Sequence, residues 1–90
     1  MTLSKTLTIV NKLGLHARAA TKLVQLANQY ECDVQITQGD QTAPANSVIA
    51  LLMLGSGMGK QVTVTCEGKD AELAMQEIEN LIVNKFDEGE

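Results

Sequence analysis

The segment Gly14-Leu15-His16-Ala17-Arg18 places the one histidine of the chain two residues before an arginine. An imidazole can act as a nucleophile, and a guanidinium offers a fork of donors that matches phosphate oxygens. A helical pattern of apolar residues begins directly after His16, which places the imidazole at a helix N-terminus. The free backbone N–H groups and the dipole of such a terminus attract anions. The segment therefore predicts a site where a histidine meets a phosphate-like group.

Positive surroundings of this kind favour the neutral form of the imidazole, which keeps a nucleophilic nitrogen. A neutral ring beside an anion site can accept a phosphoryl group and hold it in a labile N–P bond. Gly14 lets the backbone turn tightly next to the ring. An ordinary surface histidine at a helix start would have the same local sequence, so these residues alone leave both interpretations open.

Length and composition limit the class of protein. Ninety residues allow one domain, which we place at 1–90. Hydrophobic residues make up 44% of the chain and charged residues 20%, which is typical of a globular fold. Aromatic residues are only 2%, so the core must be aliphatic and base stacking on aromatic side chains is excluded. The net charge of −4 also argues against a general nucleic-acid binder.

The charges are unevenly distributed along the chain. Residues 1–30 contain Lys5, Lys12, Arg18 and Lys22 and no acid, whereas residues 31–90 contain three lysines and all eleven acids. A basic segment in an acidic protein can mark a surface that faces anions. We expect the acids of the last helix and of the tail 87–90 to lie away from the histidine, and the tail itself to be frayed.

Other motifs do not reach a functional pattern. The glycine-rich stretch 55–60 ends in Gly-Lys but lacks the earlier glycine and the following Ser or Thr of a phosphate-binding loop. Cys32 and Cys66 are too few for a disulfide scaffold and form no CxxC pair, so no metal site is expected. No signal peptide or membrane-spanning segment is visible, which predicts a cytoplasmic protein without membrane insertion.

The hydrophobic periodicity predicts four strands and three helices. The order is strand, helix, strand, strand, helix, strand, helix, which favours an α+β sandwich of two layers. Asn46 or Ser47 can cap the short second helix. The expected strands cover residues 6–9, 32–37, 41–43 and 62–66, and the expected helices cover 17–28, 48–54 and 71–82.

Three segments resemble the HPr family of histidine-containing phosphocarrier proteins of the bacterial phosphotransferase system. They are G-L-H-A-R at 14–18, N-S-V-I-A-L-L-M-L at 46–54 and V-T-C-E-G-K-D-A at 64–71. The resemblance covers nearly the whole chain. It implies an open-faced sandwich of order βαββαβα, in which three helices cover one face of a four-stranded antiparallel sheet.

The resemblance also assigns roles to residues. It makes His16 the residue phosphorylated at Nδ1 and Arg18 the side chain that steadies the phosphoryl group. The amides of Ala17 and Arg18 would complete the anion site. Ser47 matches a serine that a kinase modifies in some bacteria and that elsewhere caps a helix, which is our default interpretation. Ala19 stands where the family usually has proline, so the first helical turn should be slightly less ordered.

A helix as short and apolar as 48–54 cannot bury all of its sides, and exposed apolar groups mark partner sites. In the family, this helix and the histidine loop form the docking face. For Leu52 and Met53 of this helix, packing in the core is an equal alternative to a docking role. By this resemblance we expect a docking role for five residues, which are Leu15, Val48, Ile49, Leu52 and Met53.

The family sheet order places the second and fourth strands side by side. Val34 can then lie near Val64, and Cys32 near Cys66, which predicts two neighbouring buried thiols that form no disulfide. The two thiols are expected to be structural rather than reactive.

The function implied is that of a monomeric phosphoryl carrier rather than an enzyme, with no cofactor. It would accept a phosphoryl group on His16 from Enzyme I and pass it to an Enzyme IIA. The family has a sugar branch and a nitrogen-related branch (NPr), and the run 45–54 with the acidic tail favours the second. The alternative is a non-catalytic regulatory module that binds a partner protein through the apolar helix 48–54.

Overall fold

The computed structural model describes residues 1–88 and contains four strands and three α-helices in the expected order. Within this range no helix is both long enough and apolar enough to cross a bilayer. A single turn, η1, follows the last helix at Lys85–Asp87. The other elements are β1 (Thr2–Thr8), α1 (Ala17–Ala27), β2 (Cys32–Gln38), β3 (Gln41–Pro44), α2 (Val48–Met53), β4 (Gln61–Gly68) and α3 (Ala71–Val83).

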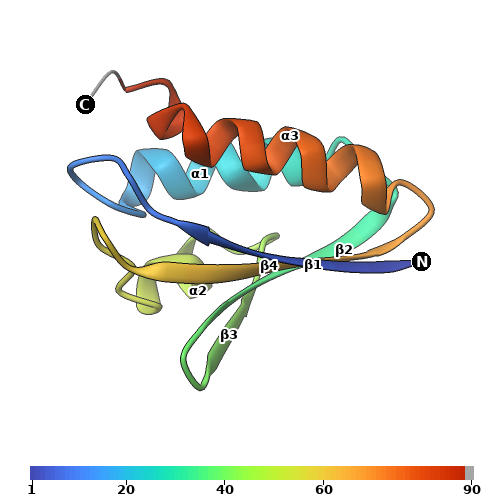
Figure 1. Cartoon of the computed structure of the whole chain (residues 1–90), viewed down its shortest axis with the longest axis horizontal. Helices are drawn as coiled ribbons and strands as arrows, with labels where there is room; N and C mark the ends of the chain where they lie inside the picture. Colours follow the sequence, from blue (N-terminus) through green and yellow to red (C-terminus); the bar gives the residue numbers. More distant parts are fainter. Residues whose placement is uncertain (89–90) are drawn as a thin grey trace.

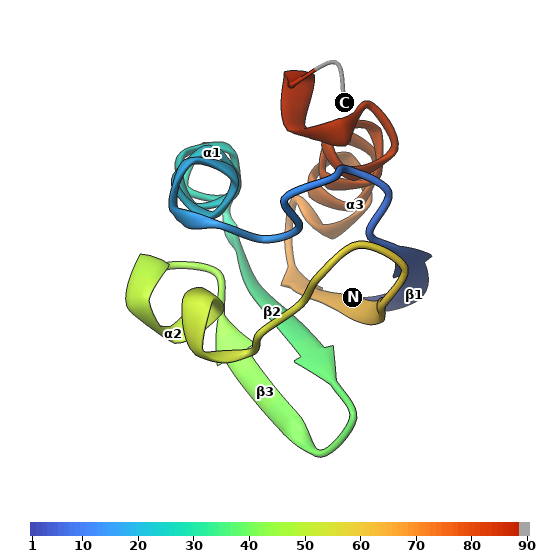
Figure 2. The ribbon, with the colours of Figure 1, turned by 90° about the vertical axis from the view of Figure 1, so that its left-hand side faces the viewer.

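The strands form one antiparallel sheet in the order β1-β4-β2-β3, so β4 and β2 lie at its centre. All three helices lie on the same side of this twisted sheet, with α1 and α3 next to each other and α2 near the end where α1 begins (Figures 1 and 2). The predicted open-faced α+β sandwich of order βαββαβα is confirmed.

Strand β1 is longer than the sequence predicted, since it begins at Thr2 and pairs with β4 along its whole length. The prediction started at Thr6 because Lys5 interrupts the apolar alternation between Leu3 and Leu7. In the structure Lys5 Nζ forms an ion pair with the Glu79 carboxylate of α3 at 2.7 Å. An ion pair to the covering helix thus lets a charged residue occupy a strand position that the pattern alone disfavours.

The core between the sheet and the helices is aliphatic, as the composition predicted. The exception is Phe86, a fully buried aromatic ring from the turn after α3. The opposite face of the sheet carries hydroxyl pairs, which join Ser4 to Thr65 at 3.1 Å and Thr6 to Thr63 at 3.0 Å. The largest aliphatic side chains in the core are Ile9, Leu23, Ile36, Leu51, Ile78, Ile82, Val62 and Val64.

The loop between β1 and α1 is held against the loop that precedes β4. The N–H of Gly59 donates to the carbonyl of Ile9 at 2.8 Å, and the N–H of Leu15 donates to the carbonyl of Ser56 at 2.8 Å. Gly14 has a φ of +68°, and a Cβ at this position would lie 2.5 Å from the Ser56 carbonyl oxygen. Any side chain here would push the loops apart, so only glycine allows this close contact between them.

The two cysteines lie on the neighbouring strands β2 and β4, and both are free thiols. The register pairs Val34 with Cys66 and Cys32 with Gly68, which is two residues away from the expected neighbours Val34 with Val64 and Cys32 with Cys66. The two cysteines therefore lie diagonally across the neighbouring strands and not directly opposite each other. The prediction of a buried thiol is confirmed for Cys66, which is fully buried, and is wrong for Cys32, which is half-buried at the start of β2. Burial raises the pKa of Cys66 to about 11. The pKa of Cys32 is also raised, mainly by burial and to a smaller extent by the negative charges of Asp70 and Asp33.

These surroundings predict an order of alkylation. In the native protein near neutral pH, iodoacetamide should modify Cys32 slowly and leave Cys66 intact, because the reactive species is an accessible thiolate. Peptide mass spectrometry over time measures both sites, and the chain unfolded in urea is the control in which both should react quickly. Modification of native Cys66 at the unfolded rate would contradict this description of the core.

Candidate functional site

His16 is the N-cap of α1, as the sequence predicted. Its backbone is extended (φ −85°, ψ −177°), and its Nδ1 accepts a hydrogen bond from the backbone N–H of Arg18 at 3.3 Å. Its carbonyl accepts the first helical bond, from Ala20 N at 2.8 Å. The side chain is 25% exposed, so the ring is held by its neighbours but remains open to a partner. A helix terminus thus presents its donors to Nδ1, the nitrogen without a proton in this arrangement.

Asn11 is a residue of the site that the sequence analysis missed. It is fully buried, and its Nδ2 donates to the Gly14 carbonyl at 2.8 Å and to Glu88 Oε1 at 3.0 Å. Both neighbours are acceptors, so the amide nitrogen and not the oxygen must face them. A single asparagine in a polar loop gives no sequence signal, because its role depends on a contact 77 positions away.

Glu88 contacts the histidine ring directly. Its Oε2 is hydrogen-bonded to His16 Nε2, while Oε1 accepts the bond from Asn11. Its side chain is only 10% exposed. The expectation that the acids of the tail lie away from the histidine is therefore wrong for Glu88, as is the expectation that it is frayed. Residues 89–90 of the predicted frayed tail lie outside the described residues.

The surroundings of Glu88 favour the ionised carboxylate. Burial by itself raises the pKa of the carboxyl group, but the hydrogen bonds from Asn11 and His16 and the charge of Lys22 outweigh it. The net result is a lowered pKa. A carboxylate can only accept hydrogen bonds, so the proton between Glu88 and the ring belongs to His16 Nε2.

The basic N-terminal third does not act as one surface. Lys5 is paired with Glu79, and Lys22 Nζ donates to the carbonyl of Phe86 at 2.6 Å. Arg18 and Lys12 are exposed, and Arg18 lies in the first turn of α1 directly after the exposed Ala17. The excess positive charge that remains near His16 is therefore smaller than the count along the sequence indicates.

Helix α2 begins at the predicted cap. Ser47 Oγ accepts a hydrogen bond from the backbone N–H of Ala50 at 3.2 Å, which confirms the capping role of Ser47. Leu51 is fully buried and anchors this short helix in the core. Ala19, which stands in place of the family's proline, is fully buried within α1.

The apolar residues assigned to docking divide between surface and core. Ile49 and Met53 are 72% and 77% exposed, Leu52 is 40% exposed and Val48 is half-buried. Core packing is therefore not the explanation for Leu52 or Met53. Leu15 is 6% exposed and takes no part in an exposed face, because its amide is tied to the neighbouring loop and its side chain joins the core.

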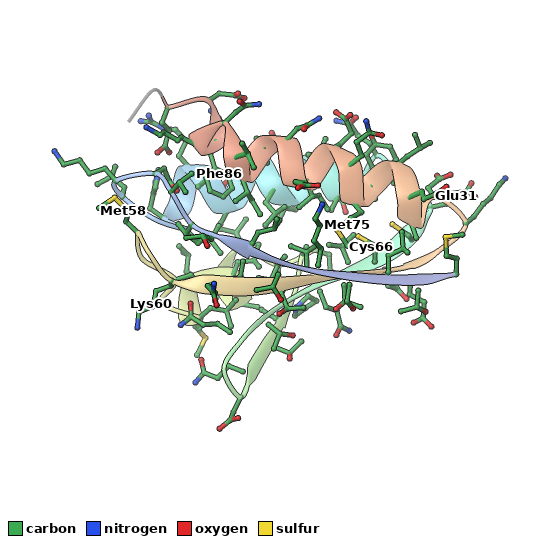
Figure 3. The ribbon with its side chains drawn as sticks, viewed as in Figure 1. Glu31, Met58, Lys60, Cys66, Met75 and Phe86 are labelled. Carbon is green, nitrogen blue, oxygen red and sulfur yellow. The ribbon has the colours of Figure 1, made fainter. Side chains whose placement is uncertain are left out.

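Two further apolar side chains, which the sequence did not predict to be exposed, lie in the adjoining loops. Leu13 is 66% exposed in the loop before α1, and Met58 is 61% exposed in the loop before β4. These loops contact each other through Gly14 and Ser56, and Figure 3 shows Met58 at the same end of the molecule as the loop between β1 and α1. A lone apolar residue in a loop has no periodicity that would indicate its exposure. We call the exposed set of Leu13, Ile49, Leu52, Met53 and Met58 the apolar face.

The arrangement can therefore bind an anion at the start of α1 and offer it the Nδ1 of a histidine, beside an apolar face. Among residues 1–88, no group of three His, Cys, Asp or Glu side chains could hold a metal ion.

Comparison with known proteins identifies the family of the chain. The family model described as "PTS HPr component phosphorylation site" matches residues 3–84. The chain is 51% identical to phosphocarrier protein NPr of Shewanella violacea (97% of this chain, 96% of the relative) and 42% identical to phosphocarrier protein HPr of Cupriavidus necator (98% and 99%). The crystal structure of HPr-C-His from Thermoanaerobacter tengcongensis superposes with a TM-score of 0.91 at 34% identity, covering 96% and 97% of the two chains. The chain belongs to the PTS HPr family of phosphocarrier proteins.

Proposed function

We propose that His16 is the residue that carries the phosphoryl group in this phosphocarrier, and that Nδ1 is the atom that bonds phosphorus. The observation that carries the proposal is the position of Nδ1 at the N-terminus of α1, where the N–H of Arg18 points at it. Nδ1 has a lone pair in this arrangement because Nε2 holds the proton. An incoming phosphoryl group would meet both a nucleophile and the donors that bind its oxygens.

The transfer is a displacement at phosphorus between two histidines. The lone pair of His16 Nδ1 forms the new N–P bond, and the old bond to the donor's histidine breaks with its electron pair returning to that ring. The proton on Nε2 stays in place. Such a reaction depends mainly on positioning and on neutralising the oxygens, so a small carrier without a catalytic pocket is sufficient.

Arg18 stabilises the phosphoryl group in this proposal. Its side chain is exposed in the first turn of α1, two residues after His16, and would contact the oxygens of a phosphoryl group on Nδ1. The guanidinium would add charge-assisted bonds to those of the Ala17 and Arg18 amides. Ser47 keeps its role as the cap of α2.

The partners are the phosphorylated Enzyme I as donor and an Enzyme IIA as acceptor, in the cytoplasm, with the chain acting as one monomeric domain, 1–90. The apolar face is the surface on which both would dock. It borders the histidine loop, because the loop before β4 contacts Gly14 and Leu15 directly. A shared surface for donor and acceptor also explains why a carrier exposes large apolar side chains in water.

Within the family we assign the chain to the nitrogen-related branch. The support is the higher identity to the NPr relative than to the HPr relative compared above. The alternative of a regulatory module that never carries phosphate is not favoured by the comparisons, since the relatives that match the chain are phosphocarrier proteins.

The first prediction concerns the phosphoryl site. Incubation with phosphoenolpyruvate and Enzyme I should add an acid-labile phosphoryl mass to the wild-type chain and none to His16→Ala. Arg18→Ala should lower the rate of transfer by about tenfold, because a charge-assisted hydrogen bond is lost at an exposed position. Lys12→Ala, which removes an equal charge from the neighbouring loop, should stay close to wild type. Modification that survives His16→Ala, or none in the wild type, would favour the binding module.

The second prediction concerns docking. Ile49→Glu should raise the KM for phosphorylation by Enzyme I by about tenfold or more, since a charge would be placed in an apolar contact. Leu73→Glu is the matched control, because Leu73 is 57% exposed on α3, an element outside the apolar face. Equal effects of the two variants on KM would show that the face has no special role.

The third prediction concerns the branch. The Enzyme I of the nitrogen-related branch should phosphorylate the chain with a higher kcat/KM than the Enzyme I of the sugar branch. Both enzymes are compared at equal concentration, each with its own carrier as the positive control. Exclusive phosphorylation by the sugar-branch enzyme would overturn the assignment.

A further inference from the structure

The turn that carries Glu88 to the histidine has an uncommon backbone. Lys85, Phe86 and Asp87 have φ angles of 57°, 53° and 63°, all in the left-handed region. Residues with side chains rarely adopt this conformation in succession because it is sterically unfavourable. Such a backbone persists where surrounding contacts hold it, and it is concentrated at functional sites.

Contacts with α1 and within the turn hold it in place. The Phe86 ring is fully buried, and Lys22 Nζ of α1 donates to the Phe86 carbonyl at 2.6 Å. The N–H of Glu88 donates to the carbonyl of Lys85 at 3.0 Å. The turn lies over the loop between β1 and α1 in both ribbon views, and Figure 3 shows Phe86 beneath it. The buried ring thus acts as an anchor that fixes where the next carboxylate lies.

Two independent contacts define the state of the histidine ring. Oε2 of Glu88 accepts from His16 Nε2, and the N–H of Arg18 donates to His16 Nδ1. One nitrogen therefore faces an acceptor and the other faces a donor, and both contacts select the same tautomer. Asn11 donates to the second oxygen of Glu88 and so fixes the plane of the carboxylate.

We propose that Glu88 is a positioning residue for phosphoryl transfer, held by Asn11 and by the turn at Phe86. Its carboxylate keeps the proton on Nε2, leaves the lone pair of Nδ1 aimed at the start of α1, and balances the positive charge that the ring gains when Nδ1 bonds phosphorus. This inference rests on the proposed function of His16. It adds a carboxylate to a site that the sequence predicted to consist of basic and neutral groups only.

The chemistry follows from charge balance. When Nδ1 attacks phosphorus, its lone pair forms the N–P bond and the ring becomes cationic, while Nε2 retains its proton. The adjacent carboxylate stabilises this cation and lowers the barrier to its formation, in the way that a buried aspartate supports a histidine in hydrolases. On the return step the ring leaves as the neutral imidazole with the same proton on Nε2, so no proton has to move.

The test compares three variants. Glu88→Gln removes the charge but keeps the shape, and its amide can turn either an oxygen or an NH₂ group toward Nε2. Glu88→Asp keeps the charge on a shorter side chain. Asp87→Asn is the matched control, since it removes one charge from the neighbouring exposed position of the same turn, and asparagine tolerates a positive φ.

Two quantities are measured for each variant. The ¹⁵N chemical shifts of the ring report the fraction of His16 protonated at Nε2, and rapid-quench assays give the rate of transfer from phosphorylated Enzyme I. Glu88→Gln should increase the fraction protonated at Nδ1 and slow transfer by about tenfold, the usual effect of losing a charge-assisted hydrogen bond. Glu88→Asp should recover part of both quantities, and Asp87→Asn should match wild type in both.

The outcomes separate this inference from the proposed function. If the wild type is phosphorylated on His16 and Glu88→Gln matches it in tautomer and rate, the positioning role is overturned and the function stands. If Glu88→Gln slows transfer with an unchanged tautomer, or only to the extent that Asp87→Asn does, Glu88 has a merely structural or general electrostatic role and the inference also fails. If the wild type is not phosphorylated on His16, the proposed function itself fails.

Discussion

One close backbone contact determines where the site lies. Gly14 packs against Ser56 and Gly57 so tightly that no side chain fits between the two loops. This contact fixes the end of the loop before α1, and hence the point at which His16 starts the helix. It also brings the loop after α2 to the histidine, so that the apolar face and the nucleophile share one end of the molecule. Chemistry and docking therefore depend on the same glycine.

The fold could be predicted because its signals are local. The strands and the two longer helices, α1 and α3, bury the faces that the hydrophobic periodicity indicated. Helix α1 also begins where the helical pattern begins, directly after its N-cap His16. The start of β1 was missed, since Lys5 satisfies its charge through Glu79 on a distant helix. Cys32 is more exposed than expected because it lies at the start of β2, opposite Gly68, which has no side chain to cover it. Both errors concern contacts between elements, which local patterns do not encode.

The site was predicted only in part, for a related reason. The nucleophile, the helix start and the cap of α2 are each encoded within a few residues. Asn11 and Glu88 become parts of the site only because a left-handed turn brings the end of the described chain across the molecule. No helical or strand pattern predicts three successive residues with positive φ. The charge count was also a poor guide, because Lys5 and Lys22 are used within the fold and the key acid lies next to the ring.

The open face of the sheet has a further consequence for how the chain selects its register during folding. Hydroxyl pairs join Ser4 to Thr65 and Thr6 to Thr63, but a slip of β1 by two residues would again place hydroxyls opposite each other. The hydroxyl pairs on this face therefore do not distinguish the native alignment of β1 with β4 from one shifted by two residues. The native alignment must be selected by the face of the sheet that packs against the helices and by the residue after β1, Ile9. The backbone of Ile9 is hydrogen-bonded to Gly59 and Lys60. The bonds that distinguish the native alignment of β1 are thus the same bonds that hold the loop leading to the histidine in place.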